Sequence, residues 1–525
     1  MNRNPPFYIT TPIYYPNGEP HLGHIYTTTC ADVVARWRRL QGRDVRFLTG
    51  TDEHGIKMVK TAAAEGVTPR ALADRNAAVF RSAFEALRIS NDDFIRTSED
   101  RHKRGVQAIV TQLQSAGDIY LGSYEGWYDE GQEEFVTETE AKANEYKSPI
   151  SGRPLVRYQE PTYFFRLTKY VDAVYEAISS DRLLVRPENR KNEVLSKLKG
   201  WSADLSISRT SLDWGVPIPS DPKHVLYVWV DALSNYITAL GYGAEPPAPD
   251  AAEAGQSLFH RYWPADVHLI GKEILWFHTF YWPAMLLSLG LPLPRCVYAH
   301  GWWTSDGKKM SKSLGNFIDL ERVQSLAGAY SLDALRYYLL RAAPFGSDLD
   351  FSDADFQKSF AELGNVLGNC LNRVLKMLNK YRAGVLPALG PALTSLDEQL
   401  IAAIERLPGA LADAYDRLEL QQAVLLPMEL ARQTNGYIDA TQPFSLAKDE
   451  SRRQPLDTVL HLSAQAIARA LTGLLPVLPW KAGEGLGQLG VPEGERSGQG
   501  LWAHLPLGHR VGEGSPLFPR LEKPV

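Results

Sequence analysis

The chain has 525 residues, of which 44% are apolar and 22% are charged, and its formal net charge is −5. This length suits three or four domains with sizeable cores. The charge excludes a histone-like polycation but not a nucleic-acid partner, because 56 Lys and Arg residues can gather on one face.

The three cysteines, Cys30, Cys296 and Cys370, lie far apart, which argues against a disulfide framework and fits a reducing cytoplasm. No apolar run reaches transmembrane length and the first expected strand leaves no room for a signal peptide, so we expect a cytoplasmic protein without a membrane partner.

The first 115 residues alternate between strand and helix patterns. An apolar run over residues 7–15 predicts a strand, a Pro16-Asn17-Gly18 turn follows, and a helix is expected from His24 to Gln41, where Gly42 can end it. A second strand over residues 45–49 leads to Asp52. The fold class is therefore α/β, with a doubly wound parallel sheet of the Rossmann type that binds ligands at the carboxyl ends of its strands.

The segment His21-Leu22-Gly23-His24 stands where the first helix begins. Backbone N–H groups at a helix start point at anions, and two imidazoles can donate to phosphate oxygens. Gly23 would let a nucleotide approach closely. Taken alone, a His-x-Gly-His segment is more often an ordinary turn with satisfied histidines.

Composition changes after the first half of the catalytic domain (1–115). Short, turn-rich pieces over 116–225 indicate an inserted domain, and the second half of the catalytic domain (226–305) resumes with strands expected at Val225–Val230, His268–Ile270 and Val297–His300. The segment 306–355 carries Lys309-Met310-Ser311-Lys312-Ser313 and a linker. Lys309 and Lys312 can close over a pyrophosphate, although such a run alone is more often a solvated, mobile loop.

The two signatures together resemble the HIGH and KMSKS signatures of class I aminoacyl-tRNA synthetases, and their order supports a nucleotide site that directs attack at the α-phosphate of ATP. Two stripes at helical spacing follow predicted strands, and they hold Trp229, Ala232, Leu233 and Tyr236 in the first and Ile274, His278 and Trp282 in the second. By periodicity alone, such stripes more often face an ordinary core.

Over roughly residues 6–480 the chain resembles the methionyl-tRNA synthetases. The resemblance rests on Thr11 to Gly18, on Trp229 to Tyr236, and on Gly271-Lys272-Glu273-Ile274 with His278. It implies ATP-dependent activation of methionine to methionyl-adenylate, transfer to the 3'-terminal ribose of methionine tRNA, and release of AMP and pyrophosphate. It also implies a methionine pocket, which would consist of Ile13, Tyr15, Trp229, Ala232, Leu233, Tyr236, Ile274, His278 and Trp282, with Asp52 receiving the ammonium.

The remaining implied roles concern the nucleotide. The catalytic residues would be His21, His24, Lys309 and Lys312, and the other ATP-binding residues would be Gly23, Gly271, Glu273, Met310 and Ser311. ATP is expected to act as a substrate with Mg²⁺ bridging its phosphates. The chemistry of the pocket agrees, because an aromatic slot favours a polarisable thioether and offers a charged side chain no partner.

Beyond about residue 356 the strand patterns end, and Leu/Ala-rich periodic segments indicate an α-helical domain over 356–525 with an irregular tail. The last 45 residues are expected to pack irregularly or partly as a hairpin. A helix over Phe360–Leu378 would bury Phe360, Leu363, Leu367, Leu371, Val374 and Leu378. The resemblance assigns Asn369 and Arg373 to the tRNA anticodon, and Phe444 stands where relatives usually have a stacking tryptophan.

Many methionyl enzymes hold a zinc ion with cysteine pairs in the inserted domain. Here Asp129, Ser148 and Ser151 occupy that region, and they do not make a tetrahedral zinc site. We therefore expect a metal-free turn in this region, with no structural zinc and no metal-ligating residues in the protein. The expected partners are methionine, ATP, and initiator and elongator methionine tRNA. We expect a monomer, because the chain lacks an appended carboxyl-terminal domain of the kind that dimerises some relatives.

The residues argue against three alternative functions. A leucine, isoleucine or valine enzyme would carry an editing insertion of about 200 residues, for which 116–225 is too short. A cysteine enzyme would need zinc ligands, which are absent from the sequence of that segment. A small-molecule nucleotidyltransferase can use His-x-Gly-His but would not need a helical bundle. An RNA-binding protein with a dead catalytic fold would not need His21, His24, Lys309 and Lys312 intact.

Overall fold

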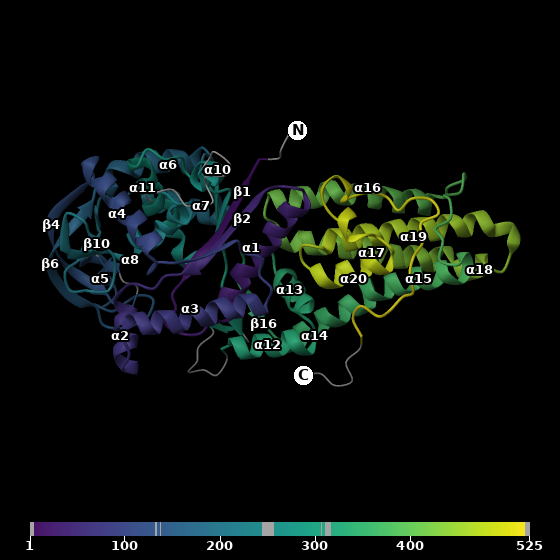
Figure 1. Cartoon of the computed structure of the whole chain (residues 1–525), viewed down its shortest axis with the longest axis horizontal. Coiled ribbons are helices and arrows are strands. Elements are labelled where there is room, and N and C mark those ends of the chain that lie inside the picture. Colours follow the sequence, from purple (N-terminus) through teal and green to yellow (C-terminus); the bar gives the residue numbers. More distant parts are fainter. Residues whose placement is uncertain are drawn as a thin grey trace. The chain divides into compact units, whose positions relative to one another are not determined.

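The computed structural model describes residues 5–131, 134–136, 138–243, 257–305, 307–309 and 317–519. The chain divides into two compact units, each made of separate segments. The sheet unit comprises Pro6–Pro20 and Val45–His300, and the helical unit comprises Met1–Pro5, His21–Asp44 and Gly301–Val525. Figure 1 shows the elements of both units.

The sheet unit is built on a six-stranded parallel sheet with the order β3-β2-β1-β12-β13-β7. Its strands are β1 (Phe7–Tyr14), β2 (Val45–Thr51), β3 (Asp93–Arg96), β7 (Leu184–Arg186), β12 (Val267–Gly271) and β13 (Cys296–His300). The strand order reverses between β1 and β12, and the crevice at such a reversal is where open parallel sheets bind ligands. The predicted α/β class and Rossmann-type sheet are confirmed.

Two details of the sheet differ from the sequence prediction. The edge strand β7 comes from within the segment predicted as inserted, and its three residues are too short to give a recognisable pattern. The strand predicted at 225–230 is wrong in its second half, because β11 spans Asp221–Leu226 and helix α8 begins at Val228. Val228 and Val230 are buried there, so tertiary packing overrides their preference for strands.

A second, antiparallel sheet lies within residues 116–225. Its strand order is β5-β4-β6-β8, with β4 (Ile119–Asp129), β5 (Glu134–Val136), β6 (Val156–Phe165) and β8 (Leu205–Ser206). A small sheet follows, with β9 (Ser208–Arg209), β10 (Pro217–Ile218) and β11. The predicted domain boundaries themselves stay a prediction.

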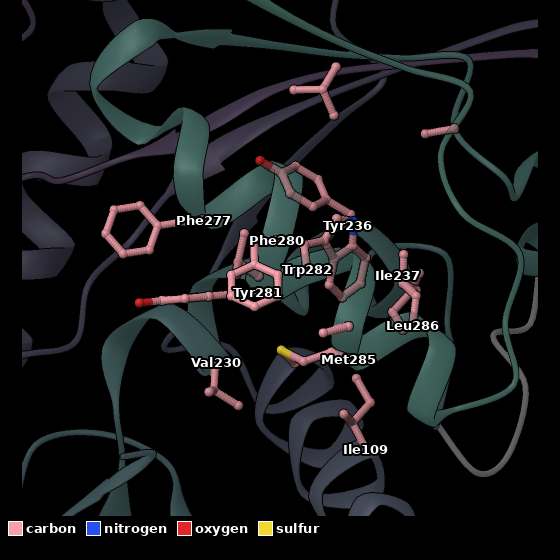
Figure 2. Packing of buried hydrophobic residues seen from close by; sticks show 14 of the residues in the cluster. Ile109, Val230, Tyr236, Ile237, Phe277, Phe280, Tyr281, Trp282, Met285 and Leu286 are labelled. Carbon is pink, nitrogen blue, oxygen red and sulfur yellow. The ribbon is translucent and has the colours of Figure 1, made fainter. Parts of the chain in front are cut away.

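Helices complete the sheet unit, and the described ones are α2 (Ile56–Glu65), α3 (Pro69–Ala86), α4 (Asp100–Ser115), α5 (Glu138–Ala143), α6 (Val171–Ser179), α7 (Glu188–Leu198), α8 (Val228–Leu233), α9 (Asn235–Thr238), α10 (Leu258–Tyr262) and α11 (Trp282–Ser288). A π-helical turn, Phe277–Tyr281, leads into α11. Aromatic side chains from this turn gather around Tyr236 and Trp282 in a large buried core (Figure 2). Ile109 of α4 and Met285 of α11 also pack in that core (Figure 2).

The helical unit contains α1 (Leu22–Leu40), α12 (Leu320–Ala329), α13 (Leu332–Arg341), α14 (Asp353–Glu362), α15 (Asn369–Arg382), α16 (Ser395–Asp416), α17 (Leu420–Thr441), α18 (Pro443–Leu446), α19 (Arg453–Leu474) and α20 (Pro479–Gln488), with short strands β14 (Trp303–Ser305), β15 (Lys308–Lys309) and β16 (Leu349–Phe351). Helices α15, α16, α17 and α19 run side by side as a bundle (Figure 1). The predicted helical region is thereby confirmed.

The helix predicted over Phe360–Leu378 is confirmed as an unbroken helical run, with a π-helical stretch inside it. It comprises the end of α14, a π-helical stretch over Leu363–Gly368, and the first part of α15. The predicted apolar residues are buried except Phe360, which is half-buried. After α20, residues 489–519 form short turns and a single bridge between Val385 and Arg510, so this described part of the tail contains no hairpin.

Long-range contacts place α1 in the helical unit. The buried Asp32 carboxylate pairs with the Arg336 guanidinium of α13 at 2.7 Å. Trp37 stacks on Tyr415 of α16 with ring centroids 4.5 Å apart. Within the described residues, no helix is both long enough and apolar enough to cross a membrane.

Candidate active site

The first signature forms the start of α1, where two histidines cap the helix reciprocally. His21 Nδ1 accepts the Gly23 N–H at 3.1 Å, and His24 Nδ1 accepts the His21 N–H at 3.2 Å. The rings stack with centroids 3.8 Å apart. Because each Nδ1 accepts a hydrogen bond, the neutral rings carry their protons on Nε2, the tautomer that can donate to an anion.

Packing explains the glycine between these histidines. A Cβ at Gly23 would lie 3.0 Å from the Cε1 atom of His21, closer than ordinary contact allows. Burial lowers the pKa of His24 well below its usual value, and the neighbouring His21 lowers it further. His24 is therefore a neutral hydrogen-bond donor at physiological pH.

The chain is described at the start of the second signature and again four residues after its end, and both stretches belong to the helical unit. Lys309 ends β15, where its backbone pairs with Thr304 of β14. The chain is described again at Phe317, whose ring meets His21 edge-on at 5.3 Å. The Leu22 N–H then donates to the Ile318 carbonyl at 3.1 Å, and Asp319 bridges to His21. The structure thus ties residues 317–319, which follow the second signature, to the start of the first.

Met310, Ser311 and Lys312 lie outside the described residues, and of Lys309 only the backbone is described. Their predicted contacts with ATP therefore stay predictions.

The candidate methionine pocket lies in the sheet unit, at the carboxyl ends of β1, β2 and β12. Ile13, Trp229, Leu233, Tyr236, Ile274 and Trp282 belong to one apolar cluster there. Trp229 lies flat on Phe277, with ring centroids 3.7 Å apart. Tyr15 lies instead against a second cluster, with Trp214 and Met58, and its hydroxyl donates to the His54 carbonyl at 2.7 Å.

A directed chain of hydrogen bonds fixes His278. Its Nδ1–H donates to the Ile274 carbonyl at 2.9 Å, which leaves Nε2 to accept from the Tyr236 hydroxyl at 2.6 Å. Burial lowers the pKa of His278 to about 4, against the opposing effect of the Ile274 carbonyl. The pocket therefore presents neutral polar groups and aromatic faces, which suit a thioether and reject a charged side chain.

A similar chain fixes the other end of the pocket. The Trp282 indole N–H donates to His268 Nε2 at 3.2 Å, and His268 Nδ1 bonds the Thr10 hydroxyl at 2.8 Å. Tyr236 packs against the His268 ring at 4.2 Å. The sequence analysis missed Phe277, His268 and Thr10, although His268 falls inside a strand it predicted.

Asp52 and the Gly271 segment flank this pocket. Asp52 follows β2 and is buried, and its N–H donates to the Tyr14 carbonyl at 2.8 Å. Ala232 is also buried, one turn beyond Trp229. A Cβ at Gly271 would lie 2.3 Å from a Glu273 carboxylate oxygen, so the glycine allows that exposed carboxylate to fold back over β12.

The anticodon candidates lie on the bundle. Asn369 is exposed at the start of α15, one turn before Arg373. Arg373 donates to Asn435 at 3.2 Å and to Asp439 at 2.5 Å, both on α17. Phe444 in α18 is 50% exposed, so its ring is available for stacking.

The predicted zinc-free turn has a hydrogen-bonded geometry of its own. Ser148 Oγ accepts the N–H groups of Ile150 at 3.3 Å and Ser151 at 3.1 Å, and Asp129 accepts the Gly131 N–H at 2.8 Å. Among the residues that the structure describes, no group of three His, Cys, Asp or Glu residues could hold a metal ion.

The chain is similar to known proteins over most of its length. Residues 7–375 match the family model of class I tRNA synthetases (M). The chain is 45% identical to a methionine–tRNA ligase of Bacillus cereus, covering 99% of this chain and 79% of the relative, and 44% identical to that of Bacillus subtilis, covering 99% and 78%. The solved structure of Mycobacterium tuberculosis methionyl-tRNA synthetase with methionyl-adenylate superposes with a TM-score of 0.90 at 40% identity, covering 98% of this chain and all of that one. The chain therefore belongs to the methionyl-tRNA synthetases, within the class I tRNA synthetase family.

Proposed function

We propose that the chain activates methionine with ATP and then transfers it to methionine tRNA, and that its residues divide this work as follows. The observation that carries the proposal is the likeness, over almost the whole chain, to an enzyme solved with methionyl-adenylate. The neutral aromatic pocket around Tyr236 and His278 supports the same substrate.

Methionine would place its thioether among Ile13, Tyr15, Trp229, Ala232, Leu233, Tyr236, Ile274, His278 and Trp282, and its ammonium against Asp52. The carboxylate of methionine is then the reactive group. One of its oxygens attacks the α-phosphorus of MgATP, the bond from that phosphorus to the bridging oxygen breaks, and pyrophosphate leaves. No protein nucleophile is needed, because positioning and charge neutralisation suffice.

His21 and His24 would donate Nε2–H groups to the α-phosphate region, and Lys309 and Lys312 would neutralise the departing pyrophosphate. Gly23, Gly271, Glu273, Met310 and Ser311 would line the nucleotide, with Glu273 accepting from ribose hydroxyls. Mg²⁺ would enter as part of the substrate, held by phosphate oxygens. In the second step, a terminal ribose hydroxyl of the tRNA attacks the adenylate carbonyl and AMP leaves.

The bundle would recognise tRNA. Asn369 and Arg373 would contact anticodon bases, and Phe444 would stack on one of them. We further propose that the protein acts in the cytoplasm as a monomer without structural zinc.

Substitution of Lys312 tests the division of labour at the nucleotide. Lys312→Ala should lower the single-turnover rate of adenylate formation by about a hundredfold or more, since it removes a charge that acts on the leaving group. The dissociation constant of methionine should change less than about twofold, and Lys312→Arg should retain most of the rate. Equal losses in rate and in methionine binding would contradict this role.

A further inference from the structure

Asp231 is a buried carboxylate in α8, between the pocket residues Trp229 and Ala232. Its side chain is about 1% exposed, and each of its oxygens meets an imidazole. Oδ2 lies 2.6 Å from His54 Nδ1, and Oδ1 lies 2.8 Å from His102 Nε2. The sequence analysis singled out neither Asp231 nor His102.

The two imidazoles come from separate elements. His54 lies two residues after Asp52, beyond the end of β2, whereas His102 lies in α4. His102 also bonds the Thr238 hydroxyl of α9 through Nδ1 at 2.8 Å. One carboxylate therefore joins the segment of Asp52 to the helices that carry Trp229 and Tyr236.

The Asp52 segment is also held on its other side. Glu53 is buried and accepts two hydrogen bonds from Arg96, at 2.6 and 3.0 Å. The Trp214 indole donates to the Glu53 carbonyl at 2.5 Å. These contacts tie the segment to β3 and to the loop before β10, and the His54 carbonyl also accepts the Tyr15 hydroxyl at 2.7 Å. The bond between His54 and Asp231 instead connects the segment to the helix that carries Trp229.

The charge of Asp231 strengthens both of its bonds. Burial alone would raise the pKa of this carboxyl, but His54 and His102 outweigh burial and hold the pKa well below its usual value. Asp231 is therefore ionised at neutral pH, and hydrogen bonds to a charged group are stronger than those between neutral groups. A network this costly to bury is stable only when both oxygens are satisfied.

We propose that Asp231 is a positioning residue for methionine, which fixes the ammonium acceptor Asp52 at one set distance from the aromatic pocket. The inference rests on the proposed function, because it assigns the ammonium to Asp52 and the thioether to the pocket. Methionine bridges the two, so a loose connection between them would weaken its binding while the nucleotide contacts persist.

Asp231→Asn tests the proposal with little change of shape. The amide is neutral and offers only one acceptor oxygen, so both imidazoles lose a charged partner and one of them also loses its acceptor. We expect the KM for methionine in pyrophosphate exchange to rise by about tenfold to a hundredfold. The KM for ATP should stay within about twofold, and kcat, normalised by active-site titration, within about threefold.

Asp118→Asn is the matched control, because Asp118 is a buried carboxylate of the same unit that bonds Lys169, Tyr170 and Ser288 rather than the pocket. It should leave the KM for methionine unchanged. Two substitutions of His102 in α4 test the same hydrogen-bond network. His102→Gln can still donate to Asp231 and should bind methionine almost as the unsubstituted chain does, whereas His102→Leu should raise the KM as Asp231→Asn does.

The outcomes separate the two proposals. A KM for methionine within twofold of the unsubstituted value in Asp231→Asn, or equal increases for methionine and ATP, would overturn the positioning role. If Asp231→Asn does not fold, the two His102 variants decide, and equal KM values in that pair would overturn it. An unsubstituted chain without methionine-dependent exchange would instead overturn the proposed function.

Discussion

At the residue scale, the histidines of the first signature carry two tasks with different nitrogens. Their Nδ1 atoms accept backbone N–H groups and so cap α1. This fixes the tautomer and leaves Nε2–H as a donor, which the proposed function directs at phosphate oxygens. The rings stack with centroids 3.8 Å apart, and a Cβ at Gly23 would press on the His21 ring at 3.0 Å. Substitution of either histidine would therefore disturb the helix start as well as the donor.

Tyr236 offers a sharper test at this scale, because its hydroxyl acts mainly on one partner. Tyr236→Phe keeps the aromatic ring but leaves the buried His278 Nε2 without the donor that it now has at 2.6 Å. We expect methionine to bind about five- to thirtyfold more weakly, since an unsatisfied buried acceptor costs about 1–2 kcal/mol. Intrinsic tryptophan fluorescence can measure the dissociation constant, because Trp229 and Trp282 lie in the pocket.

Tyr337→Phe is the matched control for that variant. Tyr337 is equally buried, but its hydroxyl donates to Glu362 in the helical unit. Its removal should leave methionine binding unchanged. Identical effects of the two substitutions would contradict a specific role for the bond between Tyr236 and His278.

At the scale of elements, the Asp333 side chain links helices α13 and α20. Its carboxyl group is buried, so its ionisation destabilises the folded state. It belongs to α13 and accepts the Lys481 N–H near the start of α20 at 2.5 Å. Burial raises its pKa to about 6, against the opposing effect of that N–H group. The folded protein thus holds the proton to higher pH than the unfolded chain does. The protonated Asp333 carboxyl therefore adds to the free energy of unfolding at pH 4, and this contribution is lost as the pH rises through 6.

Asp333→Asn should remove this loss while keeping an oxygen for the Lys481 N–H. Relative to the unsubstituted protein, the variant should gain up to about 3 kcal/mol of unfolding free energy between pH 4 and pH 7.5, from a shift of about two pKa units. Denaturant unfolding of the helical unit at the two pH values measures the difference. A gain that does not depend on pH would contradict the assigned pKa.

The hydrogen bonds in the turn around Ser148 lead to a prediction about the zinc content of the protein. Its hydroxyl already accepts two backbone N–H groups, at 3.3 and 3.1 Å, and the turn closes without a thiolate. We expect elemental analysis of the purified protein to find far less than one zinc ion per chain. Treatment with a chelator that is removed before MgATP is added should leave the exchange rate unchanged. About one tightly held zinc per chain would refute this expectation.

At the scale of the whole molecule, the local patterns predicted the fold class well, because it rests on strands such as β1 and β12 with strong apolar runs. They could not predict that α1 joins the helical unit, since that grouping depends on Asp32 meeting Arg336, about 300 positions away. The three-residue strand β7 was missed for the same reason, because its pairing with β13 is not a local property.

The site shows the same division. Spacing brought Trp229, Tyr236, His278 and Trp282 together correctly, and the apolar cluster and hydrogen bonds of the structure connect them. Residues that act through others, such as His268 and Asp231, carry no periodic pattern. The position of Asp231 between two predicted pocket residues was its one signal in the sequence. Only the fold shows that His54 and His102 are its hydrogen-bond partners.

The most direct test of the whole account is amino-acid-dependent exchange of labelled pyrophosphate into ATP, measured separately with each of the twenty proteinogenic amino acids. The account predicts strong exchange with methionine alone, because the neutral aromatic pocket fits a thioether and excludes charged side chains. Absence of exchange with methionine, or stronger exchange with another amino acid, would contradict it.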